Sequence, residues 1–332
     1  MSLTIIKGGI LDSIQDEGRF GFQASGINPG GAMDVFSARL ANCLLGKAMN
    51  SAVIEIHFAA PVVSFNEDAI ICITGANFTP EIGDREIQIN QPAIVNKNAV
   101  LQFKKVKQGA RCYLAVLNNF SLAPWLNSFS TNLKAAAGGL HGGPLKSGDI
   151  IPFEKIDALY NYLKDEPFMV LPWKAHPEDL TVPNKLEVIK GSEWDWLDEN
   201  SQQTFLNTPF KITKVADRMG YRLSVKGLHL KEQKQLVSSA VSFGTLQLLP
   251  SGQLILLMAD HQTTGGYPRV ANVISAHLPL LAQSRTNDAI SFAITDIKTA
   301  EQKLLQQFKY LQQVQYAAGF KIEKFYNDKL RS

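Results

Sequence analysis

The sequence predicts a mainly β protein of the α+β class, with two β-rich domains and a C-terminal helix. Most apolar segments are short, rich in β-branched and aromatic residues, and bounded by Gly, Asn, Asp or Pro, which is typical of strands. Prolines then interrupt a middle stretch of the chain, and the end of the chain carries apolar residues at helical spacing. We therefore expect four parts: a β-rich domain over 1–155, a linker over 156–184, a second β-rich domain over 185–295, and a helix and tail over 296–332.

In the first domain the strand-like segments are interrupted by one helix. "GGAMDVFSARLANCLLG" (30–46) has apolar residues at helical spacing, with Gly46 as the expected end of the helix. "EIGDREI" (81–87) places a Gly-Asp turn between alternating flanks and predicts a tight hairpin. The remaining strands are expected within 51–65, 69–76, 85–89, 99–106 and 111–117.

Four prolines, Pro167, Pro172, Pro177 and Pro183, break any long element in the expected linker. After it, "SEWDWLDENSQQTFL" (192–206) predicts a short helix within the second β-rich block.

The segment 295–318 reads as one amphipathic helix, with Thr295 or Asp296 as its N-cap. Its apolar stripe is expected to pack on its own domain, the alternative being a groove of a partner protein. The stripe consists of Ile297, Leu304, Phe308, Leu311 and Val314.

The composition excludes several classes of protein. Of the 332 residues, 45% are hydrophobic and 19% charged, as in an ordinary globular protein, and a formal net charge of +3 does not favour nucleic-acid binding. We recognise no signal peptide and no apolar run long enough to span a membrane. Three scattered cysteines suggest free thiols in a reducing compartment. We expect a soluble, cytoplasmic protein.

Common catalytic motifs are missing from the sequence. "GGLHGGPLKSGD" (138–149) is not a phosphate loop, because Leu145 rather than glycine precedes Lys146, and no GxGxxG or GxSxG segment occurs. Glu55 and His57 would share one face of a strand, either as metal ligands or as a hydrogen-bonded pair, and the second interpretation is favoured because no third ligand is near. We expect no metal site.

Three polar, glycine-punctuated loops suggest a shared cleft that binds anions and amides. They are "QDEGRFGFQASGINPGGAMD" (15–34), "ADRMGYRL" (216–223) and "ADHQTTGGYPRVA" (259–271). Arginine side chains and backbone amides suit a carboxylate or phosphate, and glycines permit close backbone approach.

These loops, together with "ITGANF" and "LPLLAQ", resemble the signatures of the allophanate hydrolase subunit 2 family, also described as the A and B part of a carboxyltransferase domain. The resemblance runs from about Thr4 to Phe292. It implies a two-part, mainly β architecture whose second part is a cyclophilin-like barrel. Stand-alone bacterial members of the family act as the C subunit of the ATP-dependent 5-oxoprolinase.

In that case the resemblance also implies partners and a cofactor. A subunit 1-type protein, which is the B subunit of 5-oxoprolinase, would act with this chain and ATP, with Mg²⁺, to activate the lactam oxygen of 5-oxoproline. The large A subunit would open the ring to glutamate. The ATP site is expected to be shared with the partner, no biotin is attached to this chain, and the isolated chain is expected to be inactive.

Within this interpretation, site roles follow from chemistry. Arg218, Asp217 and Asp260 are the candidate catalytic residues, the two carboxylates as partners for a substrate N–H. The side-chain ends of Arg218 and Asp260 are expected to lie within about 15 Å of each other, the span of a small-ligand pocket. Replacing Asp260 or Arg269 with alanine is expected to abolish activity but leave stability nearly unchanged. The candidate binding residues are Gln15, Asp16, Arg19, Gly30, Gly31, Tyr221, Gln262, Thr263, Thr264, Gly265, Gly266, Tyr267 and Arg269.

The sequence departs from the family pattern at several polar positions, namely Asn77, Leu117, Asn118, Asn119, Phe129 and Ser239. These departures put the substrate in doubt and leave two alternatives open. One is a carboxyltransferase component of a urea carboxylase or allophanate-type system. The other is a regulatory binding protein that antagonises a kinase inhibitor.

Overall fold

The computed structural model describes residues 1–154, 166–177, 184–224, 227–232, 234 and 236–330, and the chain divides into two compact units. Unit 1 comprises Met1–Gly18, Asp34–Asp179 and Phe308–Ser332, and unit 2 comprises Arg19–Met33 and Leu180–Gln307. Both units are therefore discontinuous in sequence. The predicted boundaries at 155 and 184 border or fall in stretches outside the described residues, so they stay a prediction.

Unit 1 contains two six-stranded antiparallel sheets. The first has the order β11 (Ile150–Pro152), β1 (Ser2–Lys7), β4 (Val62–Phe65), β9 (Val100–Phe103), β6 (Pro80–Ile82), β7 (Arg85–Glu86). The second has the order β12 (Phe168–Val170), β8 (Ala93–Val95), β5 (Ala69–Asn77), β10 (Gln108–Val116), β3 (Val53–His57), β2 (Ser13–Gln15).

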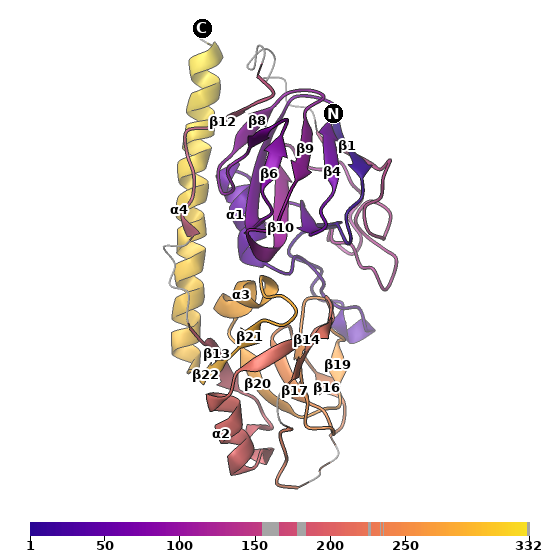
Figure 1. Cartoon of the computed structure of the whole chain (residues 1–332), viewed down its shortest axis with the longest axis vertical. Coiled ribbons are helices and arrows are strands. Elements are labelled where there is room, and N and C mark those ends of the chain that lie inside the picture. Colours follow the sequence, from indigo (N-terminus) through magenta and orange to yellow (C-terminus); the bar gives the residue numbers. More distant parts are fainter. Residues whose placement is uncertain (155–165, 178–183, 225–226, 233, 235, 331–332) are drawn as a thin grey trace. The chain divides into compact units, whose positions relative to one another are not determined.

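Alternate residues of both sheets form one core. Phe65 and Leu101 from the first sheet share it with Ile54, Ile73 and Leu114 from the second, and all five side chains are fully buried. The period-two pattern of the strands thus places one face of each sheet in a common interior. Figure 1 shows β1, β4, β9 and β6 side by side in the first sheet.

The predicted hairpin over 81–87 is confirmed. β6 and β7 pair with Ile82 opposite Arg85, and Gly83 between them has a φ of 62°. A positive φ is favourable for glycine, so the Gly-Asp turn folds as its sequence predicts.

The other face of the second sheet is contacted by α1 (Val35–Leu44), which confirms the helix expected within 30–46. The Asp34 carboxylate caps it by accepting from the backbone N–H of Ser37 at 2.8 Å. Leu45 is the C-cap, and Gly46 directly after it takes a left-handed conformation with a φ of 63°.

Unit 2 is built on an eight-stranded sheet that nearly closes into a barrel, as predicted. Its strands follow the order β21 (Ala289–Ile290), β14 (Phe210–Ala216), β15 (Gly220–Ser224), β18 (Leu254–Leu257), β17 (Thr245–Leu248), β20 (Arg269–Val273), β13 (Leu186–Lys190), β22 (Phe292–Ile294). Only Ser291 separates the two edge strands, β21 and β22, in sequence, which keeps the two edges close. All neighbouring pairs are antiparallel except β13 and β22.

Short elements complete unit 2. The helix predicted over 192–206 is split into the 3₁₀ turn η3 (Trp194–Trp196) and α2 (Glu199–Asn207), because Asp198 caps a new helix by accepting from Ser201 N–H at 2.7 Å. The others are η1 (Gln23–Ser25), η4 (Ser275–His277), α3 (Leu278–Ala282) and the strand pair β16 (Ser239–Ala240) with β19 (Thr264–Gly265).

The chain ends in α4 (Ile297–Leu330), which confirms the C-terminal helix (Figure 1). Asp296 is its N-cap, because its carboxylate accepts from Thr299 N–H at 2.9 Å. The division between the two units falls within this helix, after Gln307.

The predicted apolar stripe of α4 is only partly correct. Leu311 is buried and Val314 half-buried, but the other three positions, Ile297, Leu304 and Phe308, are exposed. Unit 2 holds its part of the helix through polar groups instead: Lys303 Nζ lies 2.6 Å from the Glu187 carboxylate, and Gln307 donates to Ala276 O at 2.8 Å. Helical spacing therefore identified the helix correctly but only part of its buried face.

Part of the expected linker is ordered sheet. β12 pairs with β8 and buries Phe168 in the unit 1 core. The remaining parts of the segment, 155–165 and 178–183, lie outside the described residues.

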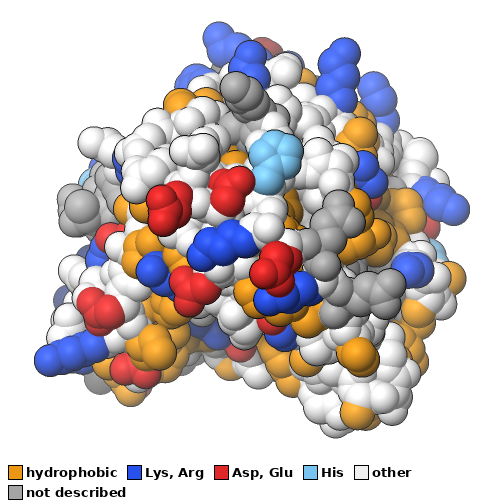
Figure 2. Space-filling view, turned by 90° about the horizontal axis from the view of Figure 1, so that it is seen from below, with side chains coloured by type: hydrophobic (Ala, Val, Ile, Leu, Met, Phe, Trp, Pro, Cys, Tyr) orange, Lys and Arg blue, Asp and Glu red, His pale blue; other side chains and the backbone are white. Residues whose placement is uncertain are grey.

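In the described part of the chain, none of the helices combines the length and apolar character that crossing a membrane requires. On the face drawn in Figure 2, acidic and basic side chains are interspersed rather than gathered by sign.

An aromatic cluster supports the unit 2 core, and its loss is testable. The Phe205 and Phe292 rings stack at a centroid distance of 4.9 Å, and Phe210 lies 5.4 Å from Phe292. Because Phe292 is fully buried, Phe292→Ala should lower the free energy of unfolding by about 3–5 kcal/mol.

Urea unfolding measures this loss of free energy. It is followed by the fluorescence of Trp194 and Trp196 in a background in which the other two tryptophans, Trp125 and Trp173, are replaced by phenylalanine. Phe320→Ala removes an exposed ring and is the control, expected to change stability little. Equal effects of the two replacements would contradict the core assignment.

Candidate anion-binding site

Strand pairing in the unit 2 barrel brings Arg218 and Asp260 together. Gly220, at the start of β15, lies opposite Leu257, at the end of β18, so the turn before one strand meets the turn after the other. Two backbone bonds extend this register, from Met258 N–H to Met219 O at 3.0 Å and from Asp260 N–H to Arg218 O at 2.7 Å. The two polar loops therefore converge although they lie far apart in sequence.

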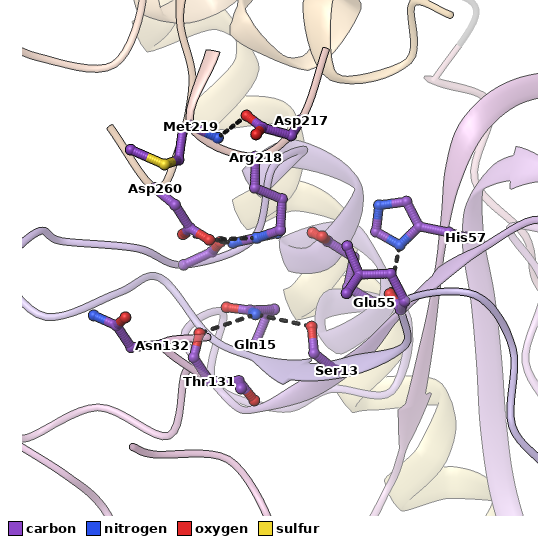
Figure 3. A network of polar contacts seen from close by, with 12 residues as sticks. Ser13, Gln15, Glu55, His57, Thr131, Asn132, Asp217, Arg218, Met219 and Asp260 are labelled. Atoms are coloured by element: carbon purple, nitrogen blue, oxygen red, sulfur yellow. Dashed lines mark hydrogen bonds and ion pairs between the residues drawn. The ribbon is translucent and has the colours of Figure 1, made fainter. Parts of the chain in front are cut away.

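The side chains complete a bidentate ion pair. Arg218 Nε donates to Asp260 Oδ2 at 2.8 Å, and Arg218 Nη2 lies 3.0 Å from Asp260 Oδ1 (Figure 3). The side chains are 4% and 13% exposed, so the charges are largely removed from water. The expectation that these groups share one small surface is confirmed.

The glycine pair of the first loop joins this ion pair. Arg218 Nη2 also donates to Gly31 O at 2.6 Å. Gly30 has a φ of 63°, and a Cβ placed there would lie 3.1 Å from Arg19 Nη1 and 3.6 Å from Asp260 Oδ1. Arg19 is itself 1% exposed, and its backbone N–H donates to Pro29 O at 2.8 Å.

We call Arg19, Gly30, Gly31, Arg218 and Asp260 the arginine cluster. It sets two buried guanidinium groups and one carboxylate beside the backbone of Gly30 and Gly31. Guanidinium N–H groups bind carboxylate and phosphate oxygens with the strongest hydrogen bonds available to proteins, and the second lone pairs of the Asp260 oxygens can accept from an N–H. The cluster can therefore hold an anionic ligand that also carries an amide. Among the described residues no three His, Cys, Asp or Glu side chains are grouped to hold a metal.

Two candidate residues of the second loop have structural partners. Asp217 Oδ1 accepts from the N–H groups of Met219 and Gly220 at 2.8 and 3.1 Å, which fixes the turn between β14 and β15 (Figure 3). Tyr221 is 2% exposed and belongs to the apolar core of unit 2. Asp217 thus shapes the turn that carries Arg218, and Tyr221 anchors the strand after it in the core.

The stretch 262–267 is organised around a glutamine that the sequence did not indicate. Gln262 Nε2 lies 3.3 Å from Gln247 Oε1, and Gln247 Nε2 lies 3.3 Å from Tyr267 O. Gly265 must lack a side chain here, because a Cβ would lie 2.5 Å from Gln247 Nε2. Of the other candidates, Thr263 accepts from Val241 N–H through its carbonyl at 3.2 Å, and Thr264, Gly266 and Tyr267 are exposed.

Arg269 pairs with Glu193, a second partner that the sequence did not indicate. Arg269 Nε and its backbone N–H both donate to Glu193 Oε2, at 3.0 and 2.9 Å, and Arg269 Nη2 lies 2.8 Å from Glu193 Oε1. The hydrogen bond from Arg269 lowers the pKa of Glu193 below its usual value. Glu193 directly precedes the buried Trp194, but nothing in the local sequence indicates that it pairs with Arg269.

In unit 1, the Asp16 carboxylate holds a loop through four hydrogen bonds. Its carboxylate accepts from Gly18 N–H at 2.8 Å, Phe129 N–H at 2.6 Å and Ser128 Oγ at 2.7 Å, and also from Ser130 Oγ. Phe129, one of the departures from the family pattern, therefore takes part through its backbone.

Gln15 is fully buried beside this loop, and one of its atoms is unpaired. Its Nε2 donates to Ser13 Oγ at 2.9 Å and approaches Thr131 O at 3.4 Å (Figure 3). Its Oε1 has no hydrogen-bond partner within the described residues. Gln15 thus remains a candidate binding residue in unit 1.

Glu55 is a buried acceptor rather than a metal ligand. Tyr113 Oη donates to Glu55 Oε2 at 2.9 Å and accepts from Asp34 N–H at 2.8 Å, which links β10, β3 and the cap of α1. Burial, followed by the charges of Glu55 and Asp34, raises the pKa of Tyr113 well above its usual value. His57, in contrast, contacts Leu11 O through Nδ1 at 2.7 Å. Glu55 and His57 were expected to bond to each other, but these hydrogen bonds run from each to a different partner, Tyr113 for Glu55 and Leu11 for His57.

The departures at 117–119 lie beside a buried lysine. Lys47 Nζ donates to Val116 O at 2.7 Å and to Asn118 O at 3.3 Å, and burial lowers the pKa of Lys47 to about 8. Asn118 and Asn119 donate to the backbone oxygen and the carboxylate of Glu154 at 2.5 and 3.2 Å. These asparagines therefore stabilise a turn of unit 1.

Of the two other departures, Asn77 is accommodated locally, whereas the buried hydroxyl of Ser239 has no hydrogen-bond partner among the described residues. Asn77 Oδ1 accepts from Thr79 N–H at 2.8 Å, which shapes the turn that leads into β6. Ser239 lies in β16, opposite Gly265 of β19.

With this geometry established, comparison with known proteins identifies the class. Residues 25–294 match the family model for the carboxyltransferase domain, subdomains A and B, and the chain belongs to that family. Over 302 residues it is 34% identical to the C subunit of the Haemophilus influenzae 5-oxoprolinase, covering 91% of this chain and 94% of that protein. The Escherichia coli protein of the same name is 33% identical, covering 94% of this chain and 97% of its own length.

Larger proteins contain the same fold. The urea carboxylase of Kluyveromyces lactis superposes with a TM-score of 0.86 at 25% identity, covering 94% of this chain and 29% of that one. The Saccharomyces cerevisiae urea amidolyase is 26% identical over 88% of this chain but only 16% of its own length. The mainly β architecture is thus shared with one part of these enzymes.

The Arg269–Glu193 pair predicts a pH dependence of stability. The pKa of Glu193 is lower in the folded protein than in the unfolded chain, where it is about 4.3. The ion pair therefore contributes its full stabilisation at pH values above the unfolded pKa, and this stabilisation is lost as the pH falls through the folded pKa. The melting temperature of Glu193→Gln should therefore lie a constant amount below wild type from pH 7 to about 5, and the difference should shrink towards pH 3. Exposed Glu323→Gln is the control. A difference that stays constant to pH 3 would show that this ionisation does not contribute.

The buried ion pair changes the stability expected of the Asp260 variant. Removing one member leaves the other charge buried, so Asp260→Ala should lower the free energy of unfolding by about 3–5 kcal/mol, rather than leave the fold nearly as stable. The double variant Arg218→Met, Asp260→Leu should recover most of this loss, because no unpaired charge remains. Urea titration measures both. A single variant within about 1 kcal/mol of wild type would restore the original expectation.

Proposed function

We propose that this chain acts as the C subunit of an ATP-dependent 5-oxoprolinase. The observation that carries the proposal is the identity of 34% over nearly the full length of a protein of that name. The arginine cluster supports it, since 5-oxoproline carries a carboxylate and a lactam N–H. Guanidinium groups of Arg19 and Arg218 would bind the carboxylate, and an Asp260 oxygen would accept from the N–H.

The proposed reaction requires partners. A subunit 1-type protein would complete the site, and a large subunit would open the ring to glutamate. When bound, ATP would supply the phosphoryl group that activates the lactam oxygen. The donor set of the arginine cluster suits anionic oxygens of either a carboxylate or a phosphate. This chain's residues would orient the substrate so that its lactam oxygen faces the phosphoryl group. The site for ATP and Mg²⁺ would be shared with the partner. A cytoplasmic location belongs to the same proposal.

Reconstitution tests the proposal. The isolated chain should show no 5-oxoproline-dependent ATP hydrolysis, and the complex with both partners should hydrolyse ATP and release glutamate. Robust turnover by the isolated chain would exclude the proposal, and so would a complex whose ATP hydrolysis does not respond to 5-oxoproline.

Arg218→Lys tests the role of the cluster within the reconstituted complex. Lysine keeps the charge but cannot form the bidentate bond, so kcat/KM for 5-oxoproline should fall about 10- to 100-fold, the equivalent of one charge-assisted hydrogen bond. Arg222→Lys, at an exposed arginine of β15, should leave kcat/KM unchanged. Melting curves of both variants establish that they are folded. Equal kinetics in the two variants would remove Arg218 from the site.

A carboxyltransferase function is the second candidate, favoured by the TM-score of 0.86 with the urea carboxylase of K. lactis. In that case the arginine cluster would bind a carboxyl group in transfer. Transfer of carboxylate from free carboxybiotin to urea, with no response to 5-oxoproline, would support this alternative.

A further inference from the structure

Unit 1 contains a pocket that neither the arginine cluster nor the proposed function uses. It has a volume of about 250 Å³ and lies between α4 and the segment around Trp173. Its floor is closed by Leu44 at the end of α1, by Trp173 and by Ala318, all of which are buried. Its open side is bordered by exposed residues, Lys174, Ala317 and Lys321 among them.

The walls of the pocket are fixed by contacts outside it. The Trp173 indole N–H donates to Leu44 O at 3.0 Å, so the ring is held against the end of α1. Tyr310 stacks on Phe36 at a centroid distance of 6.2 Å, and its hydroxyl accepts from His176 N–H at 3.1 Å. Because these rings cannot turn without losing their partners, the pocket is formed before any ligand binds.

The chemistry of the lining indicates an amphipathic anion. Lys174 and Lys321 carry the only charges among the lining residues, and neither has an acidic partner in the part of the chain that the structure describes. Apart from Gln313, the rest of the lining consists of aliphatic and aromatic side chains. A ligand that fits must place an apolar group on the floor and an anionic group between the two ammonium groups.

The size of the pocket limits the apolar group. Pockets for drug-sized ligands measure roughly 300–1,000 Å³, so this one accommodates a single aromatic ring or a medium-length alkyl chain. We propose that the pocket binds a small amphipathic carboxylate, in which one such apolar group is joined to a carboxylate held by Lys174 and Lys321.

Calorimetric titration of the full-length chain with octanoate tests the proposal, with octan-1-ol and octylamine as neutral and cationic probes. Octanoate should bind saturably with a stoichiometry of one, several-fold more tightly than octan-1-ol, and octylamine should bind more weakly still. Across the series butanoate, hexanoate and octanoate, each buried methylene should strengthen binding about fourfold. Absence of saturable binding, or equal affinities for octanoate and octan-1-ol, would overturn the proposal.

Variants locate the binding site. Ala317→Phe places a ring in the opening from an exposed helical position and should weaken octanoate binding more than tenfold. Lys174→Gln and Lys321→Gln should each weaken octanoate binding about two- to fivefold, which is the loss expected when one exposed ion pair is removed. The double variant should combine both losses. Lys309→Gln on the same helix, outside the pocket, should have no effect. Octanoate binding that Ala317→Phe leaves unchanged would place the ligand elsewhere and contradict the proposal, whatever the affinity.

Discussion

The candidate site of unit 2 depends on one buried ion pair, between Arg218 and Asp260. It ties the turn before β15 to the turn after β18, and the backbone of Gly31 is bonded to the same guanidinium. Since these charges are largely removed from water, each must keep a partner, and the three loops therefore keep one geometry. The same constraint presents guanidinium groups in a fixed direction, which is what recognition of a carboxylate requires. Stability and the proposed ligand binding thus rest on the same atoms, so a variant that loses activity must also be tested for folding.

Much of the fold could be predicted because the signals were local. Turn residues and period-two alternation indicated the strands, and a Gly-Asp pair indicated the β6–β7 hairpin. The cap of α4 was narrowed to Thr295 or Asp296, and the structure shows that Asp296 accepts the hydrogen bond from Thr299 N–H. The buried face of α4 was harder to predict, because spacing shows that apolar residues line up but not what covers them. Near its N-terminus the helix is held by an ion pair between Lys303 and Glu187, which lie more than a hundred residues apart in the sequence.

In the candidate site, too, local features could be predicted and contacts between distant residues could not. Arg218, Asp260, Gly30 and Gly31 were predicted and lie together, because polar residues at the ends of paired strands converge. Glu193 and Gln247 were missed, since each takes its importance from residues that are not its neighbours in sequence, Arg269 for Glu193 and Gln262 with Tyr267 for Gln247. Asp217 could have been recognised as a turn former, because an aspartate that precedes glycine by a few residues commonly bonds the backbone next to it. The role of Asp16 could not have been recognised, because the loop it holds lies over a hundred residues further along the chain.

The central claim is that the arginine cluster recognises a carboxylate attached to a cyclic amide, and equilibrium binding tests it most directly. In the assembled complex with its subunit 1-type partner, 5-oxoproline should bind with an affinity at least tenfold higher than 2-pyrrolidinone, which has the same ring and N–H but no carboxylate. The difference should shrink severalfold in the double variant Arg218→Met, Asp260→Leu, in which the Arg218 donors are gone, Arg19 is kept and the Arg218–Asp260 ion pair leaves no unpaired charge behind. Equal affinities for the two lactams in the wild-type complex would contradict the account.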